Sequence, residues 1–263
     1  MNINQLLSNI SPTPIDVEIQ GLCLNAANVQ AGDVFVALQG RHTHGIKYID
    51  QAIENGCVAV LVDSQDFDCN VPSVRIDNLK QHLPALASTY YSQATQVEVI
   101  GVTGTNGKTS VSYFISQLLN QLGVKNGLIG TLGITQCSVV SNNTTPDILT
   151  LYRALHQYHL NGINTAVLEV SSHGLDQNRI TGINLKQAVF TNFTQDHLDY
   201  HHSMDEYKNT KLKLFTLDSI KSVVINRDDA QHIDFLATSK HAKQTTYSLD
   251  DFEKINATAE GFL

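Results

Sequence analysis

A ten-residue segment, GVTGTNGKTS, sets a glycine turn with a lysine and a hydroxyl between an apolar stretch and one of helical spacing. Gly104 and Gly107 allow a tight turn whose backbone N–H groups converge on an anion, and a helix starting near Lys108 adds its positive end. The Lys108 ammonium and the Thr109 hydroxyl then suit the phosphates and Mg²⁺ of a nucleotide, although the spacing misses the strict G-x-x-x-x-G-K-[ST] pattern by one residue. An ordinary glycine-rich turn needs neither side chain, so we predict a nucleotide-phosphate site.

A second polar stretch, LEVSSHGLDQNRI, has Glu169 at the end of an apolar segment. A carboxylate at the end of a strand that neighbours the phosphate turn is a suitable Mg²⁺ ligand. Ser171, Ser172 and His173 raise the alternative of a serine nucleophile, but no G-x-S-x-G turn is present. Taken in isolation, the stretch is equally typical of a helix cap followed by a polar loop.

The third stretch, FTNFTQDHLDYHHSMDEYKNTKLKLF, is rich in carboxylates, histidines and lysines. Its histidines raise the alternative of a transition-metal site, but no cysteine is near and the spacing matches no common zinc motif. The oxygen-rich surroundings favour a hard cation and phosphate. For Lys208 and Lys213 we expect only a solvated helix face, whereas Lys211 stays a candidate. The other candidates are Asn192, Asp196, His197, Asp199, His201 and His202.

The elements that must position these stretches alternate between strands and helices. Apolar, β-branched segments predict strands at 97–102, 163–170, 186–193 and 221–226, and helical spacing predicts helices at 108–122, 147–162 and 228–240. Such alternation predicts a mainly parallel sheet flanked by helices, with ligands beyond the carboxyl ends of its strands. All three polar stretches fall at such ends.

A smaller α/β unit precedes this sheet. It has predicted strands at 33–38, 58–62 and 72–76 and predicted helices at 46–56 and 78–92, the second kinked or started at Pro84. The sequence therefore predicts two domains, at residues 1–93 and 94–263, in an α/β protein with a P-loop type of central domain.

Composition narrows the class of protein. The 263 residues have a formal net charge of −8, which disfavours nucleic acid as the main partner. The four cysteines have neither C-x-x-C nor zinc spacing, so we expect reduced thiols in a cytosol. The N-terminus lacks the pattern of a signal peptide, and the apolar run 57–62 is too short to span a bilayer. We expect a cytoplasmic protein with no membrane partner.

Together the three stretches resemble the Mur ligases, and within that family the MurE type, which are UDP-N-acetylmuramoyl-L-alanyl-D-glutamate:amino-acid ligases of peptidoglycan synthesis. The resemblance covers the whole chain. It lies in these motifs: T-G-T-N-G-K-T at 103–109, N-N-T-T-P-D at 142–147, E-V-S-S-H-G-L at 169–175, F-T-N-x-x-x-D-H-L-D-Y-H at 190–201 with Y-K-x-x-K ending at 211, A-G-D-V-F-V-A-L-Q-G at 31–40 and H-G-x-x-Y-I at 44–49.

The resemblance implies a reaction. ATP would phosphorylate the free D-glutamate carboxylate of UDP-MurNAc-L-Ala-D-Glu, and the amine of lysine or meso-diaminopimelate would then attack the acyl phosphate. ATP and Mg²⁺ are the implied cofactors, with a CO₂-derived carbamate on Lys211. A lysine of lowered pKa permits that modification. The family also implies a monomer.

The resemblance also implies roles for matching residues. Catalytic positions match Lys108, Glu169, His197 and Lys211; metal positions match Thr109, Glu169, His197 and Lys211. Nucleotide positions match Gly104, Thr105, Asn106, Gly107, Lys108, Thr109, Ser110, Asn192, Asn226 and Asp229. Positions for the UDP-sugar substrate match Asn143, Thr144, Thr145, Ser171, Gln177, Arg179 and His44.

Two departures from the family follow. Asn25-Ala26-Ala27 stands where the family usually has Asp-Ser-Arg, which removes two charges and a hydroxyl where the uridine is expected to dock. The family also has a C-terminal domain that closes over ATP and binds the amino acid. This chain stops before it, in a segment, INATAEGFL, that is typical of a starting strand pair, so we expect a truncated ligase.

Two alternatives remain beside the ligase. One is a non-catalytic protein that binds a nucleotide or UDP-sugar, which the Asn25-Ala26-Ala27 change favours. The retention of Lys108, Glu169, His197 and Lys211 disfavours it. The other is a folylpolyglutamate-type ligase, which shares the ATP loop but not the T-T-P and S-S-H-G-L motifs.

Overall fold

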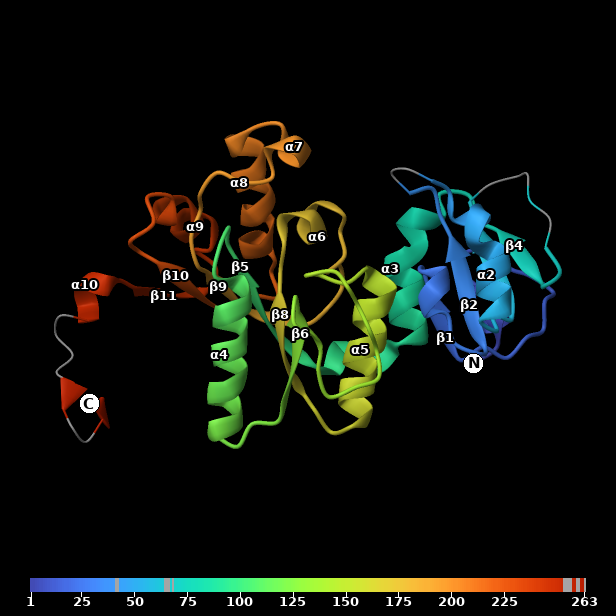
Figure 1. Ribbon diagram of the computed structural model, residues 1–263, viewed down its shortest axis with the longest axis horizontal. Helices are drawn as coiled ribbons and strands as arrows, with labels where there is room; N and C mark the ends of the chain where they lie inside the picture. The colour runs from blue at the N-terminus through green and yellow to red at the C-terminus, as the bar shows by residue number, and fades with distance from the viewer. Residues whose placement is uncertain (41–42, 64–66, 68, 253–256, 259–260, 263) are drawn as a thin grey trace.

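The computed structural model describes residues 1–40, 43–63, 67, 69–252, 257–258 and 261–262. The two larger β-sheets lie side by side along the long axis of the molecule, with helices on their faces (Figure 1). The predicted α/β class and the mainly parallel sheet flanked by helices are therefore confirmed. None of the helices among the described residues has the length and apolarity needed to cross a bilayer.

The first sheet has four parallel strands in the order β1-β2-β3-β4. They are β1 (Gly21–Cys23), β2 (Asp33–Ala37), β3 (Ala59–Val62) and β4 (Ser73–Arg75). Alternate side chains point to opposite faces. One face packs on α1 (Ile3–Leu6) and α3 (Leu79–Tyr90), and the other packs on α2 (Ile49–Glu54). The short 3₁₀ helices of this region are η1 (Ala26–Asn28), η2 (Gly45–Tyr48) and η3 (Ser92–Gln96).

Two helix predictions in this region need correction. The predicted helix at 46–56 is a 3₁₀ turn, η2, followed by the short helix α2, because His44 caps the backbone at Ile46 and fixes a separate first turn. The predicted helix at 78–92 does not start at Pro84. It begins at Leu79, and Pro84 lies inside it.

The second sheet has seven strands in the order β11-β10-β9-β5-β8-β6-β7, parallel except for β7. They are β5 (Glu98–Thr103), β6 (Asn126–Gly130), β7 (Gly133–Ile134), β8 (Thr165–Glu169), β9 (Leu185–Phe190), β10 (Ser222–Asn226) and β11 (Lys243–Tyr247). The helices that follow are α4 (Lys108–Gln121), α5 (Ile148–Leu160), α6 (Ser172–Asp176), α7 (Leu198–His201), α8 (Met204–Leu212), η4 (Lys213–Thr216), α9 (His232–Thr238) and α10 (Leu249–Phe252).

The centre of this sheet brings distant polar stretches together. β5 pairs with β8 on one side, where Val102 lies opposite Glu169, and with β9 on the other, where Thr103 lies opposite Phe190. The carboxyl ends of all three strands therefore meet at one edge, as the sequence predicted. α4 covers one face through Val111, and α5 covers the other through Leu151.

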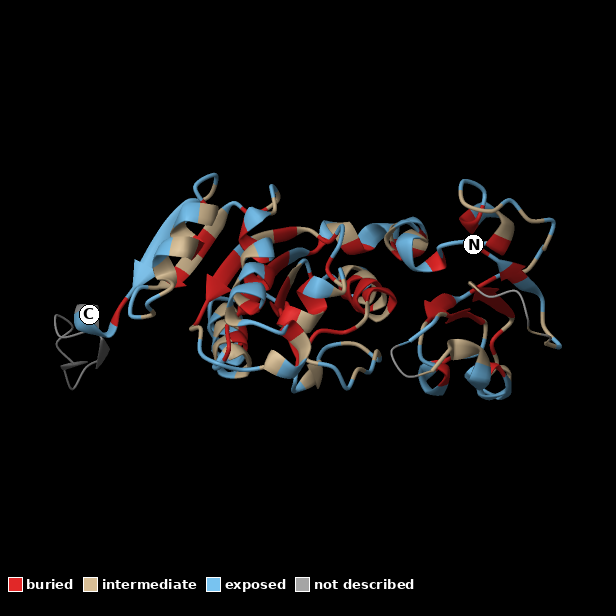
Figure 2. Cartoon of the chain, turned by 90° about the horizontal axis from the view of Figure 1, so that it is seen from above, coloured by how far each residue is buried: buried red, intermediate tan, exposed pale blue. Residues whose placement is uncertain are grey.

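The strands become less buried from the centre of the sheet toward the edge strand β11. Figure 2 shows buried residues in the central strands, whereas all five residues of β11 are exposed. β6 and β11 were not predicted: β6 contains two glycines, and β11 is polar, so neither has the expected apolar pattern. The predicted helix at 228–240 is shorter, at His232–Thr238. A short antiparallel pair, β12 (Ala257–Thr258) and β13 (Gly261–Phe262), lies in the predicted strand-pair segment; residues 255–256, 259–260 and 263 of that segment lie outside the described residues.

Candidate active site

The glycine turn joins the central strand β5 directly to α4. Gly104 has φ 149° and Gly107 has φ 81°, both in the region that favours glycine. A Cβ on Gly104 would also overlap Thr191 Oγ1 of the neighbouring segment. Helix α4 begins at Lys108, so the N–H groups of its first turn have no partner inside the helix and can face an anion.

The segment after β9 holds this turn in shape. The Thr105 N–H donates to the Asn192 carbonyl at 2.8 Å, and the Asn106 N–H donates to Asn192 Oδ1 at 2.9 Å. Asn192 Nδ2 and the Thr191 hydroxyl both donate to the Asn106 carbonyl, at 3.0 and 2.6 Å. The first half of the turn is thus held by the segment after β9. Its second half, from Gly107 onward, leads into the first turn of α4, whose backbone N–H groups are free to bind an anion. Asn192, predicted to bind the nucleotide, shapes the turn in this structure.

Glu169 lies against the phosphate turn with a nearly fully buried side chain. Its Oε2 accepts from the Thr109 hydroxyl at 2.8 Å, and its Oε1 accepts from the Thr131 N–H at 2.8 Å. A Cβ on Gly130 would overlap this carboxylate. Thr131 was missed by the sequence analysis because β6, which delivers it, was not predicted. The signal for it was a hydroxyl directly after the glycine-flanked apolar segment NGLIG.

Two lysines meet at one carbonyl of the turn. Lys108 Nζ and Lys211 Nζ each donate to the Gly104 oxygen at 2.9 Å, and Lys108 Nζ also donates to the Thr105 oxygen at 2.8 Å. Lys211 is only 1% exposed and lies 4.4 Å above the centre of the Tyr207 ring. Burial, with the Lys108 charge added, lowers the pKa of Lys211 to about 7. Burial also lowers the pKa of Lys108.

His197 stands at the start of α7 with a side chain 41% exposed. Its ring packs edge-on against His173, with centroids 4.9 Å apart, and His173 also lies 5.9 Å from the fully buried His201. Burial lowers the pKa of His201. The rings thus pack edge-to-face in an aromatic cluster, and no three His, Cys, Asp or Glu side chains of the described residues gather into a metal-binding group.

Most of the predicted substrate residues form one connected network. Thr145 Oγ1 donates to the Glu169 carbonyl at 2.8 Å and accepts from the Ser171 N–H at 2.9 Å. Arg179 Nη1 donates to the Thr145 carbonyl at 2.5 Å, and Arg179 Nη2 donates to Gln177 Oε1 at 2.7 Å. The Thr144 and Thr131 hydroxyls are hydrogen-bonded at 3.1 Å, which links the network to Glu169.

A cavity of about 240 Å³ opens where these groups meet. Residues from the phosphate turn, from the predicted substrate set and from helix α8, which carries Lys211, all line this cavity. The lining residues are Lys108, Asn143, Thr144, Thr145, Ser171, Ser172, His173, Arg179, His197 and Lys211. A larger cavity of about 510 Å³ lies between the two sheets and shares Arg179 with the first.

Four of the predicted residues, His44, Ser110, Asn226 and Asp229, line neither cavity. His44 has both ring nitrogens engaged, since Nδ1 accepts from the Ile46 N–H and Nε2 contacts Asp63 Oδ1 at 2.8 Å. Asn226 Nδ2 donates to the Thr191 carbonyl at 2.8 Å, and Asp229 Oδ2 accepts from the Phe193 N–H at 2.6 Å. These last two support the segment after β9. Ser110 is exposed on α4 and lines neither cavity.

The donor set near the turn fits a hard divalent cation. The Glu169 carboxylate and the Thr109 hydroxyl place two oxygen donors 2.8 Å apart, next to the helix end that would hold phosphates. Lys211 would need modification to act as a ligand, because an ammonium has no free electron pair for a metal.

A parallel sheet whose central strand runs through a glycine turn into a helix defines a P-loop type of α/β protein. Two family descriptions match this chain: "Mur ligase family, catalytic domain" over residues 18–91 and "Mur ligase middle domain" over residues 102–261. The chain belongs to the Mur ligase family. The predicted domain boundary at 93/94 falls between the two matches and stays a prediction.

Similar curated proteins are named UDP-N-acetylmuramoyl-L-alanyl-D-glutamate--2,6-diaminopimelate ligase. That of Listeria monocytogenes is 37% identical over 247 residues, 89% of this chain and 50% of the relative. That of Xanthomonas oryzae is 38% identical over 235 residues, 87% of this chain and 47% of the relative. The chain therefore spans about half the length of these curated relatives.

Solved structures agree with the fold. A structure described as UDP-N-acetylmuramoyl-L-alanyl-D-glutamate--2,6-diaminopimelate ligase matches with a TM-score of 0.73 and 28% identity, over 100% of this chain and 58% of that one. More distant folds are MurF ligase from Thermotoga maritima in complex with ADP (TM-score 0.58, 18% identity, 89% of this chain and 51% of that one) and Mycobacterium tuberculosis folylpolyglutamate synthase complexed with ADP and AMPPCP (TM-score 0.50, 19% identity, 70% of this chain and 50% of that one).

Proposed function

We propose that this chain provides the nucleotide-binding and UDP-sugar-binding part of an ATP-dependent ligase of peptidoglycan synthesis. The ligase would add 2,6-diaminopimelate to UDP-MurNAc-L-Ala-D-Glu. The names of the curated relatives favour this amino acid over lysine. The observation that supports the proposal most is the 240 Å³ cavity, where the half-buried Lys108 of the phosphate turn, the buried Lys211 and the predicted substrate residues face one space.

The nucleotide would bind with its phosphates at the start of α4. Lys108 would exchange its two carbonyl partners for the β- and γ-phosphates, because a charged oxygen is a stronger acceptor than a peptide carbonyl. Glu169 and Thr109 would hold Mg²⁺, which supplies charge neutralisation for the transferring phosphoryl group. ADP- and AMPPCP-bound members of the same fold support an ATP site here.

The UDP-sugar dipeptide would span both cavities, with its D-glutamate carboxylate at the smaller one. Arg179 lines both and would orient the substrate. The carboxylate oxygen attacks the γ-phosphorus, the bond to the ADP oxygen breaks, and an acyl phosphate forms. The amine of the amino acid then attacks the acyl carbon, phosphate leaves with the bonding electrons, and the amine loses a proton to give the amide.

Lys211 is the residue that we propose is carbamylated. With a pKa of about 7, about half of the Lys211 side chains carry a neutral amine at pH 7, and a neutral amine attacks the carbon of CO₂ and releases one proton. The product is an anion beside Lys108, which relieves the repulsion between the two ammonium groups. ¹³C-bicarbonate should therefore give a carbamate signal in ¹³C NMR that is absent in Lys211→Met and retained in Lys213→Met.

Trapping of the acyl phosphate tests the proposal on the chain as it stands. The purified chain would be incubated with ATP, Mg²⁺, bicarbonate, UDP-MurNAc-L-Ala-D-Glu and hydroxylamine, which converts an acyl phosphate to a hydroxamate detectable by mass spectrometry. We expect ATP-dependent hydroxamate, lost in Glu169→Gln and retained in the matched control Glu206→Gln, whose carboxylate is exposed on α8. Binding of both ligands without hydroxamate would favour the non-catalytic alternative.

Parallel assays with the amino acids test the last step. Either 2,6-diaminopimelate or lysine would replace hydroxylamine, and the mass of the tripeptide would identify the amino acid. Hydroxamate formation without tripeptide would limit the function of this chain to carboxylate activation.

A further inference from the structure

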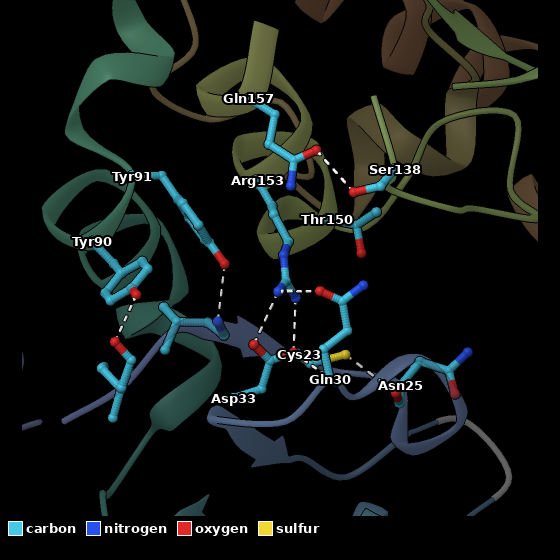
Figure 3. Close-up of polar contacts among 12 residues, drawn as sticks. Cys23, Asn25, Gln30, Asp33, Tyr90, Tyr91, Ser138, Thr150, Arg153 and Gln157 are labelled. Carbon is cyan, nitrogen blue, oxygen red and sulfur yellow. Dashed lines mark hydrogen bonds and ion pairs between the residues drawn. The ribbon is translucent and has the colours of Figure 1, made fainter. Parts of the chain in front are cut away.

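A bidentate ion pair joins the two sheets. Asp33 is the first residue of β2 in the four-stranded sheet, and Arg153 lies midway along α5, which packs on the seven-stranded sheet. Arg153 Nη1 donates to Asp33 Oδ2 at 2.8 Å, and Nη2 donates to Oδ1 at 3.0 Å (Figure 3). The Asp33 side chain is 0% exposed and that of Arg153 is 13% exposed. Among the ion pairs recorded in the described ranges, this is the one that links the sheets.

Gln30 and Gly21 restrain the geometry of the pair. Gln30 Oε1 accepts from Arg153 Nη2 at 2.8 Å, and the Gln30 N–H donates to Asp33 Oδ2 at 3.0 Å (Figure 3). Gly21 lies opposite Asp33 in the β1–β2 register. A Cβ there would overlap Asp33 Oδ1 and lie 2.9 Å from Arg153 Nη2. The glycine therefore makes room for the guanidinium against the edge of the sheet.

The apolar contacts around the pair stabilise the association of the two sheets but do not fix the angle between them. Leu22 and Val34 of the first sheet belong to the same buried cluster as Leu151 and Tyr152 of α5. Burial of apolar surface scales with area and tolerates small rotations, whereas two parallel N–H···O bonds fix both distance and angle. The apolar contacts thus favour association of the two sheets without fixing an angle, whereas the ion pair has a geometry that restricts it.

The same two elements contribute to the lining of the 510 Å³ cavity. Val36 of β2 lines it three residues beyond Asp33, about 10 Å along the strand. Ile148 of α5 lines it five residues before Arg153, about 7.5 Å along the helix. A change of angle at the ion pair therefore changes the width of the cavity. The phosphate turn follows β5 of the seven-stranded sheet and is held by Asn192, directly after β9 of the same sheet, so we expect it to be unaffected by a change of that angle.

We propose that Arg153 and Asp33 are positioning residues for the nucleotide-sugar substrate: they fix the angle between the two sheets and so the width of the cavity that this substrate enters. The identity of the ligand in this inference rests on the proposed function. The role of the ion pair in orienting the sheets is independent of the proposed function.

Binding measurements on three variants of the full chain test this. Arg153→Lys keeps the charge but cannot form the planar fork, and the double variant Asp33→Asn with Arg153→Gln replaces the pair by neutral groups of similar size. The matched control is Arg75→Lys, which changes an exposed pair with Asp77. Calorimetry would give the Kd for UDP-MurNAc-L-Ala-D-Glu and, separately, for ATP with Mg²⁺.

We expect both pair variants to raise the Kd for the UDP-sugar about tenfold while the Kd for ATP changes less than about twofold. Arg75→Lys should change neither. An unchanged UDP-sugar Kd in a folded Arg153→Lys chain would overturn the proposal. An equal loss of affinity for both ligands would overturn it as well, because a general loss of structure would then explain the effect.

A second readout separates this inference from the proposed function. Spin labels at the exposed residues Glu54 on α2 and Gln117 on α4, with Cys69 and Cys137 replaced by serine, report the distance between the sheets. The distance distribution should broaden in Arg153→Lys and stay narrow in the control. If the wild-type chain binds no UDP-sugar, the proposed function fails, and this distribution alone decides the role of the ion pair. An equally narrow distribution in Arg153→Lys would reject that role.

Discussion

Replacement of Lys211 by methionine should stabilise the chain at low pH and lose that advantage as the pH rises. Methionine has nearly the same length, can replace the contact of the ammonium with the Tyr207 ring by a contact between sulfur and the ring, and carries no charge. The Gly104 carbonyl keeps Lys108 as its donor, so the substitution leaves no unpaired oxygen. The ammonium of the wild-type chain, in contrast, has almost no contact with water.

The size of the effect follows from the pKa shift. Burial and the neighbouring Lys108 lower the pKa of Lys211 from 10.5 to about 7. At 1.36 kcal/mol per pKa unit, the buried ammonium costs the folded state about 5 kcal/mol below pH 7. Between pH 7 and 10.5 the unfolded chain binds more protons than the folded one, so wild-type stability rises with pH in that window. Between pH 6 and 9 the gain is about 3 kcal/mol.

Urea unfolding followed by circular dichroism would measure this in buffers free of CO₂, so that no carbamate forms. The quantity to follow is the difference in unfolding free energy between wild type and Lys211→Met, in which other titrating groups cancel. We expect the difference to change by about 3 kcal/mol between pH 6 and pH 9. Lys213→Met, at a side chain 55% exposed, should give a flat difference. A flat difference for Lys211→Met would refute the argument that its ammonium is buried at a cost.

Three further predictions concern the phosphate turn. Gly104→Ala should weaken ATP binding about tenfold or more, because its Cβ would overlap Thr191 Oγ1; titration with a fluorescent ATP analogue measures this, and wild-type affinity would contradict it. Glu169→Gln should abolish most of the Mg²⁺ dependence of ATP affinity, which calorimetry with and without Mg²⁺ would reveal; an unaltered dependence would exclude Glu169 as a ligand. Asn192→Ala removes the side-chain bonds to Asn106 and should lower the unfolding free energy by about 1–3 kcal/mol in urea titrations, whereas a loss below about 0.5 kcal/mol would mean that other contacts shape the turn.

The sequence was sufficient for the parts of the site that lie on strong local patterns. The glycine turn, Glu169 at a strand end and the segment after β9 were each predicted from an apolar strand followed by polar residues. The structure brings all three to one edge of the sheet. Parallel pairing makes this outcome a consequence of chain direction, because strands of one direction end at one edge.

Other parts depend on pairings that local patterns do not encode. β6 has glycines where apolar residues were expected, since Gly127 lies against the Tyr158 ring and Gly130 against Glu169. Because β6 was not predicted, Thr131, which follows it, was not recognised as a site residue either. His44 was assigned to the substrate by resemblance, yet its hydrogen bonds serve the backbone at Ile46 and Asp63, which only the fold could reveal.

The position of β5 between β8 and β9 has a consequence for synthesis on the ribosome. The phosphate turn takes its shape from Asn192, which is 86 residues beyond Asn106 in the chain. At roughly 5–20 residues per second, the turn waits roughly 4–17 s after its own translation before that partner is made. A nucleotide can stabilise the nascent chain only through a formed site, so ATP cannot assist the early folding of β5 and α4. β8 covers one edge of β5 once it has been made, but the other edge stays open until β9 emerges, so until then this apolar strand is protected only by α4 and β8.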